Sequence, residues 1–153
     1  MNATRQFLGD PAGWKDVRLH LSSMQGLWGG WLITVSGSLE VLIRRVSPAT
    51  WEARYRFNFD EAEFTAIAQT CIEHNLLTVP APARPGHPDE TMLELTLVNQ
   101  QGKSQTAHKW AGDHHPDFDA VYRAIFSLTE QIQNATPFHS GPFDWSISSS
   151  TEI

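Results

Sequence analysis

The order of the hydrophobic patterns constrains the fold of this 153-residue chain more than any other feature. Apolar and polar residues alternate in four early segments, which is typical of strands with one buried face. A stretch with helical spacing follows, then two more alternating segments and a second helical stretch. This order predicts an α+β fold in which an antiparallel sheet of five or six strands packs two helices on one face.

The clearest predicted strand covers residues 51–59, where aromatic side chains from Trp51 to Phe57 fall on one face and charged side chains on the other. Asp60 begins the first helix, and Glu63 follows at the spacing of a capping box. We expect the other strands at 17–21, 31–35, 39–43, 93–97 and 103–110, and the helices at about 60–75 and 116–132. We expect the strand at 17–21 to have one solvated face.

The sequence predicts one domain and two flanking segments. Residues 1–15 are predicted to be an irregular N-terminal segment, 16–133 a single α+β domain, and 134–153 a polar C-terminal tail on the surface. The proline-rich stretch 78–90 is predicted to be a semi-rigid loop within the domain, because neither flank alone carries enough core.

The composition limits the compartment and the partners. With Cys71 as its single cysteine, the chain can form no intramolecular disulfide, which fits a reducing compartment. The first residues lack the apolar core of a signal peptide, and no apolar run reaches the length of a membrane span. The net charge of −6 disfavours nucleic acid and anionic membranes. We therefore expect a cytoplasmic protein that binds neither nucleic acid nor membrane.

Three segments are similar to segments of a known family. They are Gly29-Gly30-Trp31-Leu32-Ile33-Thr34-Val35-Ser36-Gly37, Phe59-Asp60-Glu61-Ala62-Glu63-Phe64 and Pro88-Asp89-Glu90-Thr91-Met92-Leu93-Glu94-Leu95. Through them, residues 16–133 resemble the small uncharacterised bacterial domains called domain of unknown function 6438. The resemblance implies an α+β domain of bacterial type. Because that family comes with no assigned activity, the resemblance adds nothing on function.

The histidine-rich end of the last predicted hairpin is a candidate metal site. Its candidate ligands are His108, His114 and His115, since imidazole beside carboxylates suits zinc or a harder divalent ion. The spacing matches no known metal pattern, and adjacent residues such as His114 and His115 point apart. The favoured alternative is that Asp113 or His115 caps the second helix while the other histidines are solvated.

An arginine cluster is the candidate site for a small anion. Its members, on two strands joined by a short connection, are Arg44, Arg45, Arg54 and Arg56. If these strands pair, several guanidinium groups meet on the sheet and could bind a phosphate, a carboxylate or an acidic partner. The favoured alternative is cross-strand pairing with acidic residues. Those residues are Glu40, Glu52 and Glu94.

Six tryptophans are many for a chain of this length, and four of them fall at or near predicted strand ends. These four are Trp28, Trp31, Trp51 and Trp110. Tryptophan in such positions is common in protein-binding surfaces, although packing beneath the helices is the favoured explanation. Trp28, beside two glycines, is the least typical of a core position.

The sequence contains no nucleophile elbow and no glycine-rich phosphate loop, and Cys71 lies on the apolar stripe of a predicted helix. We therefore name no catalytic residue and no cofactor, and a non-enzymatic role is favoured. The preferred hypothesis is a protein-binding module of the immunity or adaptor type. Its expected binding residues are Trp28, Trp31, Arg44, Arg54, Arg56 and Trp110. The alternatives are a metal-dependent enzyme or sensor using the histidines and a small-anion binding domain using the arginines.

Overall fold

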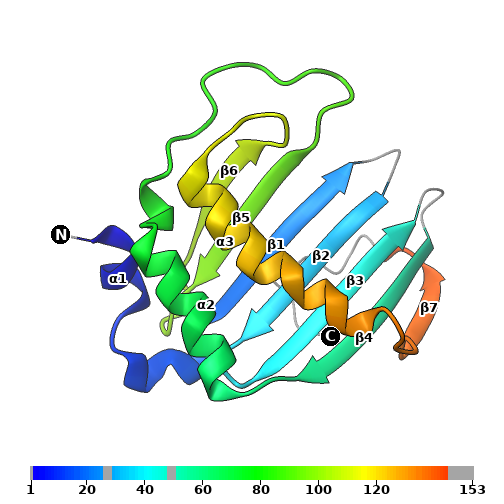
Figure 1. The fold of residues 1–153 in the computed structure, drawn as a ribbon, viewed down its shortest axis with the longest axis horizontal. Coiled ribbons are helices and arrows are strands. Elements are labelled where there is room, and N and C mark those ends of the chain that lie inside the picture. Colours follow the sequence, from blue (N-terminus) through cyan, green and yellow to red (C-terminus); the bar gives the residue numbers. More distant parts are fainter. Residues whose placement is uncertain (1, 26–28, 48–50, 145–153) are drawn as a thin grey trace.

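The computed structural model describes residues 2–25, 29–47 and 51–144, and the α+β class is confirmed (Figure 1). One antiparallel sheet of seven strands has the order β6-β5-β1-β2-β3-β4-β7. The strands are β1 (Arg18–Gln25), β2 (Gly29–Ser36), β3 (Glu40–Ser47), β4 (Trp51–Asn58), β5 (Met92–Val98), β6 (Ser104–Trp110) and β7 (His139–Pro142). The expected number of five or six strands is therefore wrong, because the sheet also contains β7. Its four residues are too few to show an alternating pattern in the sequence.

The two expected helices, α2 and α3, begin and end close to the expected residues, whereas α1 lies in the segment that was expected to be irregular. They are α1 (Ala3–Leu8), α2 (Glu61–Glu73) and α3 (Pro116–Phe126), with 3-10 turns η1 (Pro11–Asp16), η2 (Leu76–Thr78) and η3 (Ser127–Ile132). The capping box of Asp60 and Glu63 is confirmed. Figure 1 shows α2 and α3 crossing the same face of the sheet, which we call the inner face. No helix among the described residues is long and apolar enough to cross a membrane.

The main core lies between the inner face and the two helices. The sheet contributes Leu19, Leu21, Ile33, Val35, Val41, Ile43, Leu93, Leu95 and Leu97. The helices contribute Phe64, Ile67, Ala68, Cys71, Ile72, Phe118, Val121 and Ile125. Burial raises the pKa of the Cys71 thiol to about 12, so this cysteine is an inert core residue.

Both segments outside the expected domain take part in the fold. In the N-terminal segment, expected to be irregular, α1 and η1 bring Leu8 and Trp14 into the main core. In the C-terminal segment, expected to be a surface tail, β7 pairs with β4 and Phe143 is buried on the outer face of the sheet. There it packs with Leu32 and Val46 in a second, smaller cluster.

The strand β1 departs from its expected pattern on the outer face. Leu19 and Leu21 point into the core as expected, but His20, on the face expected to be solvated, is only 2% exposed. Its Nδ1 lies 2.9 Å from Thr34 Oγ1, and Nε2 has no hydrogen-bond partner in the described part of the chain. Desolvation, assisted by the charge of Arg18, lowers the pKa of His20 to about 4.

Candidate functional site

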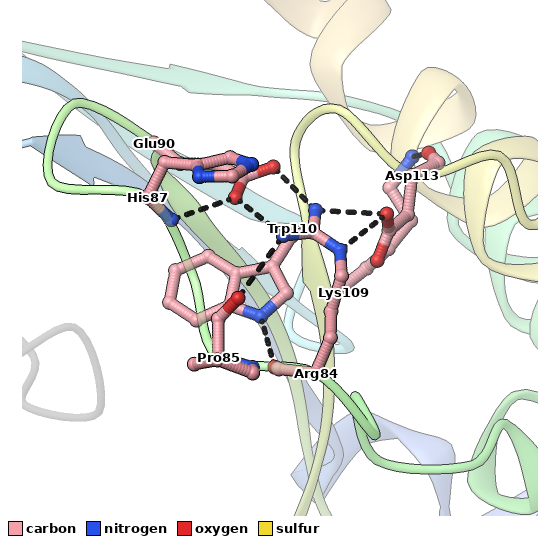
Figure 2. A network of polar contacts seen from close by, with 7 residues as sticks. All are labelled: Arg84, Pro85, His87, Glu90, Lys109, Trp110 and Asp113. Atoms are coloured by element: carbon pink, nitrogen blue, oxygen red, sulfur yellow. Dashed lines mark hydrogen bonds and ion pairs between the residues drawn. The ribbon is translucent and has the colours of Figure 1, made fainter.

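The proline-rich loop between α2 and β5 is held in place by Arg84 (Figure 2). Its guanidinium donates to both carboxylate oxygens of Glu90 at 2.9 and 2.6 Å. It also donates twice to Asp113 Oδ1, at 3.1 and 2.8 Å. Because Asp113 lies just beyond β6, one side chain ties the loop to the end of that strand.

Glu90 fixes the far side of the same loop. Its Oε1 accepts a hydrogen bond from the His87 main-chain N–H at 3.2 Å (Figure 2). The hydrogen bonds from Arg84 lower the pKa of Glu90 to about 2, so this carboxylate is charged in neutral solution. The loop is therefore crosslinked by charge-assisted hydrogen bonds despite its surface position.

Trp110, at the end of β6, packs against the loop. Its indole N–H donates to the Arg84 carbonyl at 3.1 Å, and the Arg84 guanidinium lies 6.0 Å from the ring centroid (Figure 2). A Cβ atom on Gly86 would lie only 2.3 Å from the indole, so no larger residue fits there without movement. Trp110, predicted as a binding residue, thus supports the loop.

Lys109 connects β6 to the first turn of α3. Its side chain is buried on the inner face and donates from Nζ to the Asp113 carbonyl and to Asp119 Oδ1. Burial alone would raise the pKa of Asp119, but the hydrogen bond from Lys109 and its positive charge lower it overall. The end of β6 is therefore anchored on both the loop side and the helix side.

A groove of about 400 Å³ runs between the proline-rich loop and the end of β6. Residues 79–83 form its apolar wall, with prolines at positions 80 and 82. His108, Lys109 and residues 113–115 also line the groove. The groove thus lies along the edge of the sheet, beside the last residues of an outermost strand.

On its outer side, most of the main chain of β6 has no partner among the described residues. At one end of the hairpin, the Asn99 N–H donates to the Lys103 carbonyl at 2.9 Å, and at the other the Ala111 N–H donates to the Thr91 carbonyl at 2.9 Å. Hydrogen-bonded pairs alternate along an antiparallel ladder, so odd-numbered residues of β6 bond to β5 and even-numbered ones point away. The outward residues are Ser104, Thr106, His108 and Trp110.

Of the outward main-chain groups, those of Trp110 alone bond to a described part of the chain. The Trp110 carbonyl accepts from the Asp113 N–H at 2.9 Å. No strand of the described sheet lies beyond β6, and no described residue bonds to the main chain of Ser104, Thr106 or His108 on that side. These three residues leave six main-chain groups available to an added strand.

The three histidines predicted as metal ligands have separate contacts. His108 lies on the outer face with Nε2 3.4 Å from Glu94, whereas His114 is 85% exposed with Nδ1 3.5 Å from Asp119. His115 caps α3 by accepting from the Phe118 N–H at 3.5 Å, as the favoured alternative predicts. Within the described residues, no three His, Cys, Asp or Glu side chains are grouped to hold a metal ion.

Three members of the arginine cluster form ion pairs on the outer face, whereas Arg45 lies over Trp31 on the inner face. Glu52, fully buried on the outer face, accepts from Arg44 Nε at 2.9 Å and from Arg54 Nε at 2.7 Å. Burial alone would raise the pKa of Glu52, but these hydrogen bonds lower it to about 2. Arg56 is half exposed, 3.5 Å from Glu40, so the carboxylate of a neighbouring strand takes the place of an external anion.

The predicted tryptophan sites are also distributed. Trp31 lies on the inner face, in edge-to-face contact with Phe126 at 5.6 Å, and Arg45 lies 5.3 Å from its ring. Trp51 is 52% exposed at the start of β4, whereas Trp28 lies outside the described residues. The structure therefore brings neither Trp31 nor Trp51 into the groove beside β6.

No known protein family and no curated protein matches the chain. The resemblance to domain of unknown function 6438 therefore stays a prediction.

Proposed function

We propose that this protein is a protein-binding module of the adaptor or immunity type that receives an extended segment of another protein along the edge of β6. The observation that supports this proposal is the row of main-chain groups at Ser104, Thr106 and His108 that have no partner among the described residues, the last of these residues lining the groove. Strand addition uses such groups for affinity and nearby pockets for specificity. The incoming segment would become an eighth strand.

The walls of the groove define the expected chemistry of the segment. Residues 79–83 offer apolar surface to every second side chain, because side chains alternate across a strand. The Arg84 network holds this wall before binding, which lowers the ordering cost of association. We therefore expect a partner segment with alternating small apolar and polar residues and no proline at the positions that bond to β6.

The first experiment locates the contact. A photo-crosslinking amino acid replaces Thr106 on β6 or, as a matched control, Ser140 on the opposite edge strand β7. Crosslinking in the native host, followed by mass spectrometry, identifies proteins that are captured only from position 106. Capture alone is not sufficient, because any protein near the surface can be labelled.

The second experiment tests whether the captured protein needs the strand edge. Thr106→Pro removes an outward N–H without touching the ladder to β5, whereas Thr106→Ala keeps that N–H. Both variants lose the hydroxyl contact with Thr96. Thr106→Pro should weaken binding about tenfold, the effect of one or two lost hydrogen bonds, and Thr106→Ala should not. Equal affinity for the two variants would overturn the proposal.

A further inference from the structure

The last described residues, 139–144, form a strap across the opposite side of the molecule. Within it, β7 pairs with β4 along the sheet edge, with Gly141 opposite Glu52. The chain then turns onto the outer face, where Phe143 is 9% exposed and packs with Leu32 and Val46. The Arg44 guanidinium lies 4.7 Å from the centroid of the Phe143 ring. The Phe143 side chain of the strap thus occupies an apolar slot formed by Leu32 and Val46 and covered by Arg44.

The strap is also clamped through its main chain. The Asp144 N–H donates to Glu52 Oε2 at 2.7 Å, and the Asp144 carbonyl accepts from Arg44 Nη2 at 2.9 Å. Both partners are nearly inaccessible, with Arg44 at 2% and Glu52 at 0% exposure. Buried charges that lose a hydrogen-bond partner are costly, so this groove favours a state in which some strap is bound.

The connection to the strap is short and lies at the surface. Residues 133–138 join η3 to β7, and all of them are exposed or half-buried. A strap from another molecule would make the same contacts in the same groove as the chain's own strap. Exchange of identical elements between copies therefore needs no new interface, only a change in the path of residues 133–138.

We propose that the groove formed by Leu32, Arg44, Val46 and Glu52 accepts the strap of a second copy of this chain, so that two copies exchange residues 139–144. The chain's own strap already fills the apolar slot and hydrogen-bonds to both buried charges, so the identical strap of a second copy fits the same groove. The proposal is independent of the β6 edge, which lies at the other end of the sheet.

Complementation between two full-length variants tests the exchange. Phe143→Ala spoils the strap and keeps the groove, whereas Val46→Phe fills the slot and keeps the strap. Each variant alone should remain a monomer. Mixed in equal amounts, they can form one intact strap–groove pair, so native mass spectrometry should detect a heterodimer of twice the 17.2 kDa chain mass. The mass difference between the variants distinguishes the heterodimer from either homodimer.

The matched control is Phe138→Ala, which removes a phenylalanine from the same segment but not from the slot, since Phe138 is 49% exposed and lies under Arg56. Mixed with Val46→Phe, it should give less heterodimer than Phe143→Ala does, because its intact strap competes for its own groove. If Val46→Phe does not fold by circular dichroism, Leu32→Phe fills the slot from the neighbouring strand.

Two results would overturn the proposal. One is a mixture of folded variants that stays monomeric. The other is a dimer that forms equally well from either variant alone. Thr106→Pro in both chains separates the strap from the other edge, because a strap-exchanged heterodimer should be unaffected, whereas pairing between β6 edges should be lost.

Discussion

The strands β6 and β7 lie at opposite ends of one sheet and end it by different means. β7 has four residues, includes Pro142, and leads into Phe143 and Asp144, which cover buried charges on the outer face. β6 has seven residues without proline, and its neighbouring loop is held by a surface network around Arg84. Short strands and proline discourage strand addition, whereas an unpaired regular strand permits it.

This difference separates the sources of stability from the capacity to bind. On the β7 side, side chains with almost no exposure make the contacts, so changes there should cost folding free energy. On the β6 side, the Arg84 contacts lie at the surface, and the outward main chain of Ser104, Thr106 and His108 has no partner among the described residues. Changes there should alter association more than stability. Four experiments, using substitutions or a change of pH, test this difference between the two sides.

The largest effect is expected at the β7 side. Glu52→Gln removes the carboxylate that pairs with the buried guanidinium groups of Arg44 and Arg54, and should lower the free energy of unfolding by about 3–5 kcal/mol. The control is Glu40→Gln, which breaks only the half-exposed pair with Arg56 and should cost less than about 1 kcal/mol. Urea denaturation of both variants measures the difference, and similar costs would remove the proposed contrast between buried and surface pairs.

The second-largest loss of stability is expected from a fall in pH, which acts on His20 in the middle of the sheet. The folded pKa of His20 is about 4 against 6.5 in the unfolded chain, so the unfolded state binds more protons between these values. Stability should therefore fall as pH decreases from about 6.5 to 4, by up to about 3 kcal/mol. Below pH 4.5, protonation of Glu52, with its pKa of about 2, adds a further loss.

His20→Gln removes the titrating group responsible for the first acid window. Urea denaturation at pH 7, 5.5 and 4 should then show a smaller change in unfolding free energy than in the parent. His108→Gln, which removes a half-exposed histidine, is the control and should keep the parent profile. A parent chain whose stability is constant between pH 6.5 and 4 would contradict the role given to His20.

The third experiment tests the direction of the β6 main chain. Gln105→Pro removes an N–H that bonds to β5 and should cost about 2 kcal/mol, because a ladder acceptor is also left unpaired. Thr106→Pro removes an outward N–H and should cost less than about 1 kcal/mol. Thermal and urea unfolding of the two variants give the comparison. A larger loss for Thr106→Pro than for Gln105→Pro would mean that the even-numbered residues of β6, and not the odd-numbered ones, bond to β5.

The smallest effect is expected in the proline-rich loop. Gly86→Ala places a methyl group against the Trp110 indole and should destabilise the protein by about 1 kcal/mol. Trp110→Phe shortens the ring, so the double variant should lose less than the sum of the two single losses. Indole fluorescence and hydrogen exchange of residues 79–91 report on the loop. If the losses of the two single variants add up exactly in the double variant, the contact between residue 86 and the indole is not the cause of the destabilisation.

Local signals in the sequence account well for the regular elements. The alternation of residues 51–59 and the capping pair of Asp60 and Glu63 depend on neighbours in the chain, and both are present in the structure. β7 has no comparable signal, because four residues containing glycine and proline show no period. Its place depends on hydrogen bonds to β4, far away in sequence.

The candidate site was only partly predictable. The proline-rich loop and Trp110 were noticed, but the role of Arg84 was missed, since its carboxylate partners Glu90 and Asp113 meet only after folding. A single arginine inside a proline-rich loop was the one available signal. The unpaired side of β6 follows from strand order, which a hydrophobic pattern does not encode.

The sequence by itself determined where β1 to β6, α2 and α3 form, which of their apolar side chains face the core, and that Cys71 is buried. These properties arise from local periodicity and capping, which act over a few residues. Only the tertiary structure decided that His20 is buried on the outer face, that Glu52 neutralises Arg44 and Arg54, and which strand ends the sheet. The physical reason is that burial, ion pairing and strand order depend on segments that meet from distant parts of the chain.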